Sequence, residues 1–124
     1  RAGTTTAYSW GDTISSGDAN YNWDGAHNTG ADFKQTRDVG QCSANPWGFF
    51  DMHGNVWEWT ADWRGGYPRS SAIDPRGPNE GSTRVYRGGS WYASGARLRS
   101  AIRAYYSPSS RYSHIGFRVG FQQQ

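Results

Sequence analysis

The segment GFFDMHGNVWEWTADW, residues 48–63, decides the fold because it joins a turn to a strand pattern. From Val56 to Trp63, tryptophan or alanine occupies every second position, and Val, Glu, Thr and Asp stand between them. A period of two is that of a β-strand, whose side chains alternate between two faces. We therefore predict a strand over residues 56–63 with its aromatic face toward the core.

Regular structure is expected to be sparse outside this strand. Turn residues recur throughout residues 1–46 and predict an irregular segment, and residues 64–83 form a loop rich in Pro and Gly. RVYRGGSW (84–91) and IGFRVGF (115–121) are two further strand candidates. ARLRSAIRAYY (96–106) fits a short helical turn or a strand, and we favour a strand.

The length and composition of the chain limit the kind of protein that it can be. A chain of 124 residues is expected to form one domain, residues 1–124. Hydrophobic content is 35% and aromatic content 16%, so burial rests on aromatic rings. Because the chain starts at Arg1 and shows no targeting motif or long apolar run, we expect a piece of a longer protein that makes no membrane contact itself.

The charges are unevenly distributed. No acid follows Glu80, whereas seven Arg lie between Arg84 and Arg118. A basic half with interleaved Tyr is a nucleic-acid signature. However, Lys34 is the only lysine, and several Arg stand in strict local patterns, which favours Arg as a hydrogen-bonding strut. No nucleic-acid partner is expected. A domain that binds nucleic acid through its Arg-rich half, or that is purely structural, remains an alternative.

Five motifs follow one another along the chain: AGTTTAYSWGD (2–12), GFFDMHGNVWEWTADW (48–63), RGGSW (87–91), RSAIR (99–103) and IGFRV (115–119). In this order they resemble the formylglycine-generating-enzyme (sulfatase-modifying factor) superfamily, a branch of the C-type lectin fold. The resemblance implies an α+β, loop-rich C-type lectin-like fold with short antiparallel strands. It also implies that this chain is the C-terminal part of the domain, without the N-terminal part that carries the first strand and helices.

The resembled enzyme oxidises a substrate cysteine with two cysteines that bind copper, located between its RGGSW-like and RSAIR-like motifs. Soft thiolates are the ligands that Cu(I) needs. Here that interval is YASGARL (92–98), with Ala93 about where the first cysteine would be, and the single Cys42 lies far upstream. We therefore expect no oxidase activity. A catalytic superfamily member, completed by the missing part, is the alternative.

The segment from Trp91 to Val119 resembles the C-terminal variable region of the variable proteins made by diversity-generating retroelements. These systems mutate the adenines of AAY codons to give NNY, which never encodes Lys, Glu, Gln, Met or Trp. Those five residues are absent between Arg84 and Phe121, apart from Trp91 in RGGSW. The expected variable region is residues 84–119. Whether Gly95 and Ser109 within it are diversified is left open.

The resemblance also maps the diversified, ligand-binding positions: Tyr86, Tyr92, Ala93, Ser94, Ala96, Arg97, Ile102, Ala104, Tyr105, Tyr106, Ser110, Tyr112, Ser113 and His114. Tyr, Ser, Ala and Gly make up an antibody-like paratope, and Tyr and Arg are the usual anchors of interfaces. The candidate anchors are Tyr92, Tyr105, Tyr106, Tyr112 and Arg97. We predict that these side chains gather on one solvent-exposed face.

Such a face requires a fixed backbone beneath it. Gly88 and Gly89 can adopt conformations closed to other residues. We expect Trp91, Ile115 and Phe117 to anchor the ends in the core. Four further Arg are expected to satisfy loop carbonyls, or alternatively to form a solvated face: Arg99, Arg103, Arg111 and Arg118.

The resemblance further implies a structural calcium ion. Its ligands would be the side chains of Asp51 and Glu58 and the carbonyls of Gly54 and Val56, an all-oxygen set that suits Ca²⁺. Alternatively, Glu58 bonds the backbone or an Arg. A second site would map to Asn20, Tyr21, Asp32 and Phe33. No other cofactor is expected, and His27, His53 and His114 share no zinc spacing.

The sequence therefore predicts a non-enzymatic, receptor-like protein whose variable face binds a protein or surface ligand that the sequence does not identify. The family resemblance implies a bacterial cell surface or secreted location.

Overall fold

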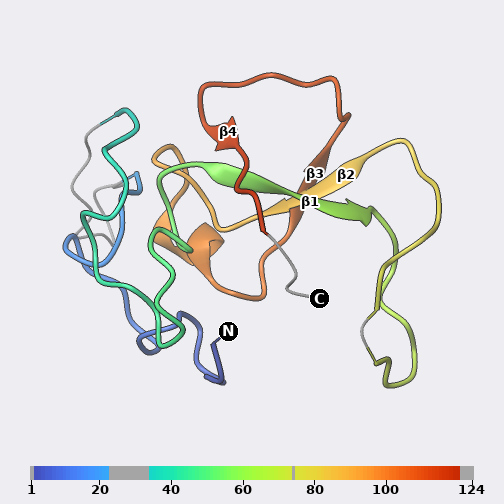
Figure 1. Ribbon diagram of the computed structural model, residues 1–124, viewed down its shortest axis with the longest axis horizontal. Helices are drawn as coiled ribbons and strands as arrows, with labels where there is room; N and C mark the ends of the chain where they lie inside the picture. Colours follow the sequence, from blue (N-terminus) through green and yellow to red (C-terminus); the bar gives the residue numbers. More distant parts are fainter. Residues whose placement is uncertain (1, 23–33, 74, 121–124) are drawn as a thin grey trace.

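In the computed structural model, residues 2–22, 34–73 and 75–120 are described, and they are built around a four-stranded sheet (Figure 1). The strands are β1 (Trp57–Trp63), β2 (Arg84–Arg87), β3 (Ala104–Tyr106) and β4 (Ile115–Gly116), in the order β3-β2-β1-β4. Within these ranges the helical structure is a single 3₁₀ helix, η1 (Gly95–Leu98), and no helix there is long and apolar enough to cross a membrane.

The register places β1 at the centre of the sheet. β2 pairs antiparallel with β1, with Trp59 opposite Tyr86, and β3 pairs antiparallel with β2. β4 pairs with the other edge of β1 in parallel, with Trp57 opposite Ile115. The expectation of antiparallel strands is therefore wrong at β4. Because β3 and β4 both run in the direction of β1, residues 107–114 form a crossover loop rather than a hairpin.

The predicted strand over residues 56–63 is confirmed, whereas the predicted strands over 84–91 and 115–121 start at the predicted residue but end early. β1 matches the predicted strand within one residue. β2 ends at Arg87 because Gly88 and Gly89 follow with φ of +93° and +78°, which turn the chain out of the sheet. β4 keeps two of the seven predicted residues, and Phe117 is 76% exposed, so its predicted role as a core anchor is wrong.

Residues 96–106, for which a helical turn and a strand were both considered, contain one of each. η1 ends at Leu98, and the chain re-enters the sheet at Ala104, so the favoured strand is correct only for the last three residues. Leu98 is fully buried, and its burial holds the helical turn against the core.

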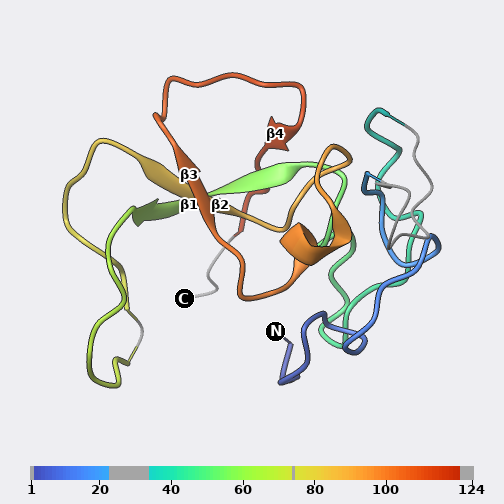
Figure 2. The same ribbon diagram turned by 180° about the vertical axis from the view of Figure 1, so that it is seen from behind.

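The hydrophobic core lies between the N-terminal segment and η1. Its buried members are Tyr8, Ala19, Tyr21 and Leu98. The Tyr8 hydroxyl donates to the Gly95 carbonyl at 2.9 Å, which joins residues distant in sequence. Figures 1 and 2 show this N-terminal segment on one side of the molecule and the loop between β1 and β2 on the other.

The tryptophans of β1 contribute less to the core than predicted. Trp57 is buried, whereas Trp59 and Trp63 are half-buried. The face that carries Trp57 and Trp59 packs on Tyr86 of β2 instead of on the cluster beneath η1. The predicted aromatic face is present, but it forms a second packed layer.

His53 connects the turn before β1 to both sides of the core. Its Nδ1 lies 2.6 Å from the Leu98 carbonyl, and its Nε2 lies 3.2 Å from the backbone N of Ser9. An N–H on Nδ1 and a lone pair on Nε2 satisfy both contacts, which is the neutral ring. Burial lowers the pKa of His53, only partly offset by the hydrogen bond to Leu98.

Candidate ligand-binding face

Four aromatic side chains at predicted positions form a continuous row on the surface. The ring of Tyr106 lies 5.2 Å from that of Tyr112, Tyr112 lies 5.3 Å from His114, and His114 lies 5.7 Å from Tyr92, centroid to centroid. The three tyrosines are between 42% and 64% exposed. We call these four residues the aromatic row, which extends from β3 across the crossover loop to the turn after RGGSW.

The aromatic row rests on buried rings of the sheet. Tyr86 stacks on Tyr106 at 6.1 Å, and the edges of Trp57 and Trp59 meet Tyr86 at 4.9 and 5.4 Å. Tyr86 itself is only 7% exposed, so the expectation that it lies on the exposed face is wrong. Its place in β2, between β1 and β3, puts its ring beneath the row.

The other predicted positions differ in exposure. Ala96, Arg97 and Ser113 are exposed, and five are half-buried: Ala93, Ser94, Ile102, Ala104 and Ser110. Ala93 packs against the core rather than pointing only outward. The undecided Gly95 is buried, and an added Cβ would lie 3.0 Å from Ile14, so this position belongs to the frame.

Tyr105 does not join the aromatic row. It is exposed, but it is adjacent to Tyr106 in β3, and successive side chains of a strand point to opposite faces. Its ring packs under the guanidinium of Arg64, whose Cζ lies 3.6 Å from the ring centroid. The prediction of one face for all four tyrosines is therefore wrong for Tyr105.

Tyr112 and His114 of the row are uncharged at neutral pH. Partial burial lowers the pKa of His114, and the Tyr106 hydroxyl raises the pKa of Tyr112. The pKa of Tyr86 is raised mainly by burial, and the charge of Arg97 opposes this rise. The segments that form this face carry arginines and no acidic residue, because no acid follows Glu80.

Main-chain hydrogen bonds hold the backbone of this face. The Trp57 N–H donates to the His114 carbonyl at 2.9 Å, and the Ile115 N–H donates to the Tyr112 carbonyl at 3.1 Å. The Asn22 N–H donates to the Ala93 carbonyl at 2.9 Å. Since none of these bonds uses a side chain, a substitution at the predicted positions leaves their donors and acceptors in place.

Arginine struts are confirmed at three of the four predicted positions. Arg99 Nε donates to the Ala96 carbonyl at 3.0 Å, Arg103 Nη2 to Gly65 at 2.7 Å, and Arg118 Nη2 to Asp51 at 3.2 Å. Arg87 is a further strut that was not predicted, and its Nη1 lies 3.3 Å from the carbonyls of Ser100 and Ile102. Its place at the start of the RGGSW motif could have indicated this role.

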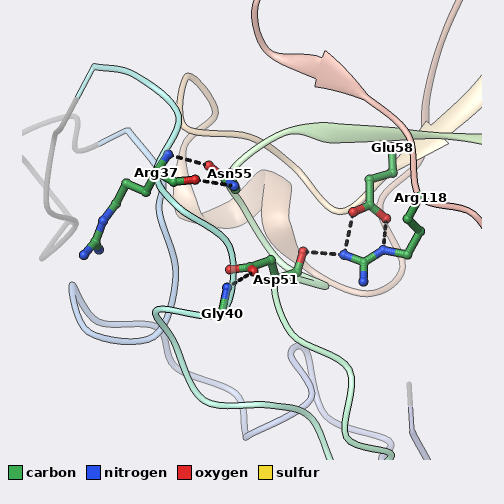
Figure 3. Close-up of polar contacts among 6 residues, drawn as sticks. All are labelled: Arg37, Gly40, Asp51, Asn55, Glu58 and Arg118. Carbon is green, nitrogen blue, oxygen red and sulfur yellow. Dashed lines mark hydrogen bonds and ion pairs between the residues drawn. The ribbon is translucent and has the colours of Figure 1, made fainter.

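The residues predicted to bind calcium do not fit a cation cage as their side chains lie (Figure 3). Both carboxylate oxygens of Glu58 accept from the guanidinium of Arg118, which also donates to the Asp51 carbonyl. The Asp51 carboxylate accepts from the Gly40 N–H at 2.7 Å. A calcium ion would have to displace Arg118 from Glu58, so the alternative of an Arg partner describes this site.

The second predicted calcium site is only partly visible. Asp32 and Phe33 lie outside the described residues. Asn20 Nδ2 donates to the Gln35 carbonyl at 3.0 Å, and Asn20 Oδ1 is buried without a hydrogen bond in the described part of the chain. Across residues 2–22, 34–73 and 75–120, no three His, Cys, Asp or Glu side chains are grouped to hold a metal.

The thiol chemistry of the resembled enzyme has no equivalent in the segment between RGGSW and RSAIR. Residues 92–98 carry no cysteine, and Leu98 at the end of that interval is fully buried. Burial, together with Asp51, raises the pKa of Cys42, although Arg37 opposes the rise. A thiol with a raised pKa carries little thiolate at neutral pH and is a poor nucleophile.

Comparisons with known proteins agree with the five motifs. The sulfatase-modifying factor enzyme 1-like domain matches residues 1–122. The chain is similar to the formylglycine-generating enzyme of Thermomonospora curvata, with 38% identity over 108 residues, covering 77% of this chain and 36% of that enzyme.

Two solved structures are similar to most of this chain. Treponema denticola variable protein 1 shares 36% identity at a TM-score of 0.68, over 82% of this chain and 34% of that one. PvdO from Pseudomonas aeruginosa shares 29% identity at a TM-score of 0.65, over 82% of this chain and 38% of that one. The chain thus spans about a third of the length of each of these three proteins.

Proposed function

This chain belongs to the family of sulfatase-modifying factor enzyme 1-like domains, and within it we propose a non-enzymatic, ligand-binding protein whose variable region, residues 84–119, is diversified by a retroelement. The proposal includes a C-type lectin-like fold for the complete domain. It also includes a bacterial cell surface or secreted location, where a diversified receptor meets its ligands.

The aromatic row is the observation that carries this proposal. Tyr92, Tyr106, Tyr112 and His114 stand at positions that NNY codons reach, and their rings are in contact at the surface. Tyr offers large contact area with few torsions to restrict, so an exposed group of tyrosines is a good binding surface. A backbone held by main-chain bonds avoids part of the ordering cost of binding.

The similarity to Treponema denticola variable protein 1 supports the same function, because that protein is named a variable protein and matches 82% of this chain. We propose a protein or surface ligand as partner. We propose no nucleic-acid partner, because Arg99 bonds a carbonyl of the fold and Arg118 bonds a carboxylate and a carbonyl. A calcium ion at Asp51 and Glu58 is not part of the proposal.

An enzyme is the second candidate, and the relatives named formylglycine-generating enzymes favour it. Residues supplied by the rest of the protein would then have to complete a site. Thiol oxidation by the full-length protein, lost on changing Cys42→Ser, would establish this candidate and overturn ours. We expect no such turnover.

A genomic comparison tests the main proposal. A reverse transcriptase gene and a near-copy of the 3′ coding sequence should lie beside the gene, with AAY at the codons for Tyr92, Tyr106, Tyr112 and His114. The copy should match the gene at the codons of the strut Arg103. A near-copy whose differences fall equally on frame codons, or the lack of any near-copy, would refute diversification.

A further inference from the structure

A cavity of about 540 Å³ lies beside β2 and β3, away from the aromatic row. Its walls come from the two ends of the loop between β1 and β2, residues 64–66 and 81–83. Val85 and Tyr105, which are paired across β2 and β3, line it from the sheet. Because Tyr105 and Tyr106 point to opposite faces, the cavity and the row are separate surfaces.

Two guanidinium groups line the cavity, and each is held against an aromatic ring. Arg64 lies over Tyr105, as described above, and Arg103 Cζ lies 3.9 Å from the ring centroid of Tyr67. Arg103 is further fixed by its bond to the Gly65 carbonyl. Stacking on a ring restricts a guanidinium without neutralising its charge or using its in-plane donors.

Among the described residues, no carboxylate forms an ion pair with either of these two charges. The cavity is lined by no acid, and neither Arg64 nor Arg103 forms an ion pair among the residues described. The remaining polar lining consists of the hydroxyls of Ser82 and Thr83 and the backbone of three glycines. The side chains that line the cavity are therefore two guanidiniums, two hydroxyls, one aromatic ring and the aliphatic group of Val85.

We propose that this cavity binds a tetrahedral oxyanion, a phosphate or sulfate group. Guanidinium forks pair with such oxygens through two parallel hydrogen bonds. Arg103 uses one of its five donors on Gly65 and keeps others for a ligand. Ser82 and Thr83, from the other end of the loop, add hydroxyl donors, and donors from separate segments suit a tetrahedral group with several oxygens more than a planar carboxylate.

The position of Tyr105 connects this site with the diversified face, a point that rests on the proposed function. Tyr105 is a predicted diversified position, whereas Arg64 and Arg103 lie outside the diversified set. The site thus combines a fixed anion-binding part with one variable wall. Its oxyanion binding itself requires neither diversification nor the aromatic row.

Titration of the full-length protein with inorganic phosphate and with inorganic sulfate tests the proposal, at constant ionic strength and with acetate as the comparison anion. We expect saturable binding of phosphate, sulfate or both by calorimetry, and none of acetate. Arg64→Gln should weaken binding about tenfold or more, because Arg64 is exposed and supplies one of two guanidiniums.

Arg111→Gln is the matched control, since Arg111 is an exposed Arg that does not line the cavity. Its affinity for phosphate or sulfate should equal that of the wild type. Equal binding of all three anions, equal loss in both variants, or no saturable binding would each overturn the proposal. A Tyr112→Ser variant should keep anion binding, which separates this test from that of the aromatic row.

Discussion

The guanidinium of Arg118 binds both carboxylate oxygens of Glu58, through Nη2 at 2.6 Å and Nε at 2.7 Å. The pair joins the IGFRV motif to β1 across sixty residues of sequence. These hydrogen bonds raise the pKa of Arg118. The positive charge beside Glu58 therefore comes from Arg118 of the same chain.

Arg118→Gln should destabilise the protein, because it leaves the largely buried Glu58 carboxylate without its partner. The side chain of Arg118 is 37% exposed, so solvent screening limits the loss to about 1 kcal/mol. Urea denaturation measures it. Arg111→Gln, an exposed Arg without an ion pair in the described residues, should stay within about 0.5 kcal/mol of wild type; an equal loss in both variants would contradict this role for Arg118.

Calcium should not stabilise the wild-type protein through Glu58. Arg118 holds both oxygens of that carboxylate, and a cation would have to displace it. We expect the same thermal unfolding midpoint with millimolar-range calcium as with a chelator. In Arg118→Gln the carboxylate is released, and calcium should then raise the midpoint. A chelator that lowers the midpoint of the wild type, but not that of Glu58→Gln, would show that the calcium site exists.

Stability should fall as the pH drops below about 6.5, the ordinary pKa of His in an unfolded chain. Burial lowers the pKa of His53 in the folded state, so between the two pKa values the unfolded chain binds a proton that the folded chain does not. The contribution is complete above pH 6.5 and is lost toward the folded pKa. His114 acts in the same direction.

His53→Gln tests the assignment. It should lower stability at pH 7, because Ser9 and Leu98 lose well-placed partners, and it should flatten the pH dependence of stability below about pH 6.5. The pH series of denaturation midpoints decides this. An unchanged slope in the variant would assign the effect to other groups.

The aromatic row and its base should respond differently to substitution. Tyr112→Ser should change the free energy of unfolding by about 0.5 kcal/mol or less, as expected at an exposed site. Tyr86→Ser should lower it by about 3 kcal/mol, because the buried ring contacts Trp57, Trp59 and Tyr106. Similar losses in the two variants would mean that the row is part of the fold rather than a replaceable surface.

Gly89→Ala should destabilise the turn between β2 and the variable region. Gly89 has a φ of +78°, and an added Cβ would lie 2.5 Å from Leu98 Cδ1. Strain and overpacking together predict a loss of roughly 2 to 3 kcal/mol. Gly17→Ala is the control, since nothing lies within 4 Å of its added Cβ and its φ is not positive. Unfolding curves that show no difference between the variants would contradict the role of Gly89.

The sequence predicted the elements whose signals are local. Alternation identified β1, and the paired glycines of RGGSW marked the end of β2. The strict setting of Arg99 and Arg103 indicated struts rather than a basic surface, as the carbonyl contacts confirm. The NNY pattern indicated which side chains to look for, and three of the four candidate tyrosine anchors lie together.

Relations between distant segments were not predictable in this way. The parallel direction of β4, the burial of Tyr86 and the pairing of Arg118 with Glu58 depend on which strand edge meets which loop. The cavity lined by Arg64 and Tyr105 was not predicted either, because its lining residues come from separate strands and from both ends of a loop.

By itself, the sequence determined the family, the alternation of β1 and the restricted alphabet of residues 84–119, because each is recorded in the order of neighbouring residues. Only the tertiary structure decided that Tyr106 joins the aromatic row while Tyr105 faces a cavity, and that a guanidinium lies where calcium was predicted. The physical reason is that strand pairing sets the face of each side chain, and pairing is decided by packing between segments far apart in the chain.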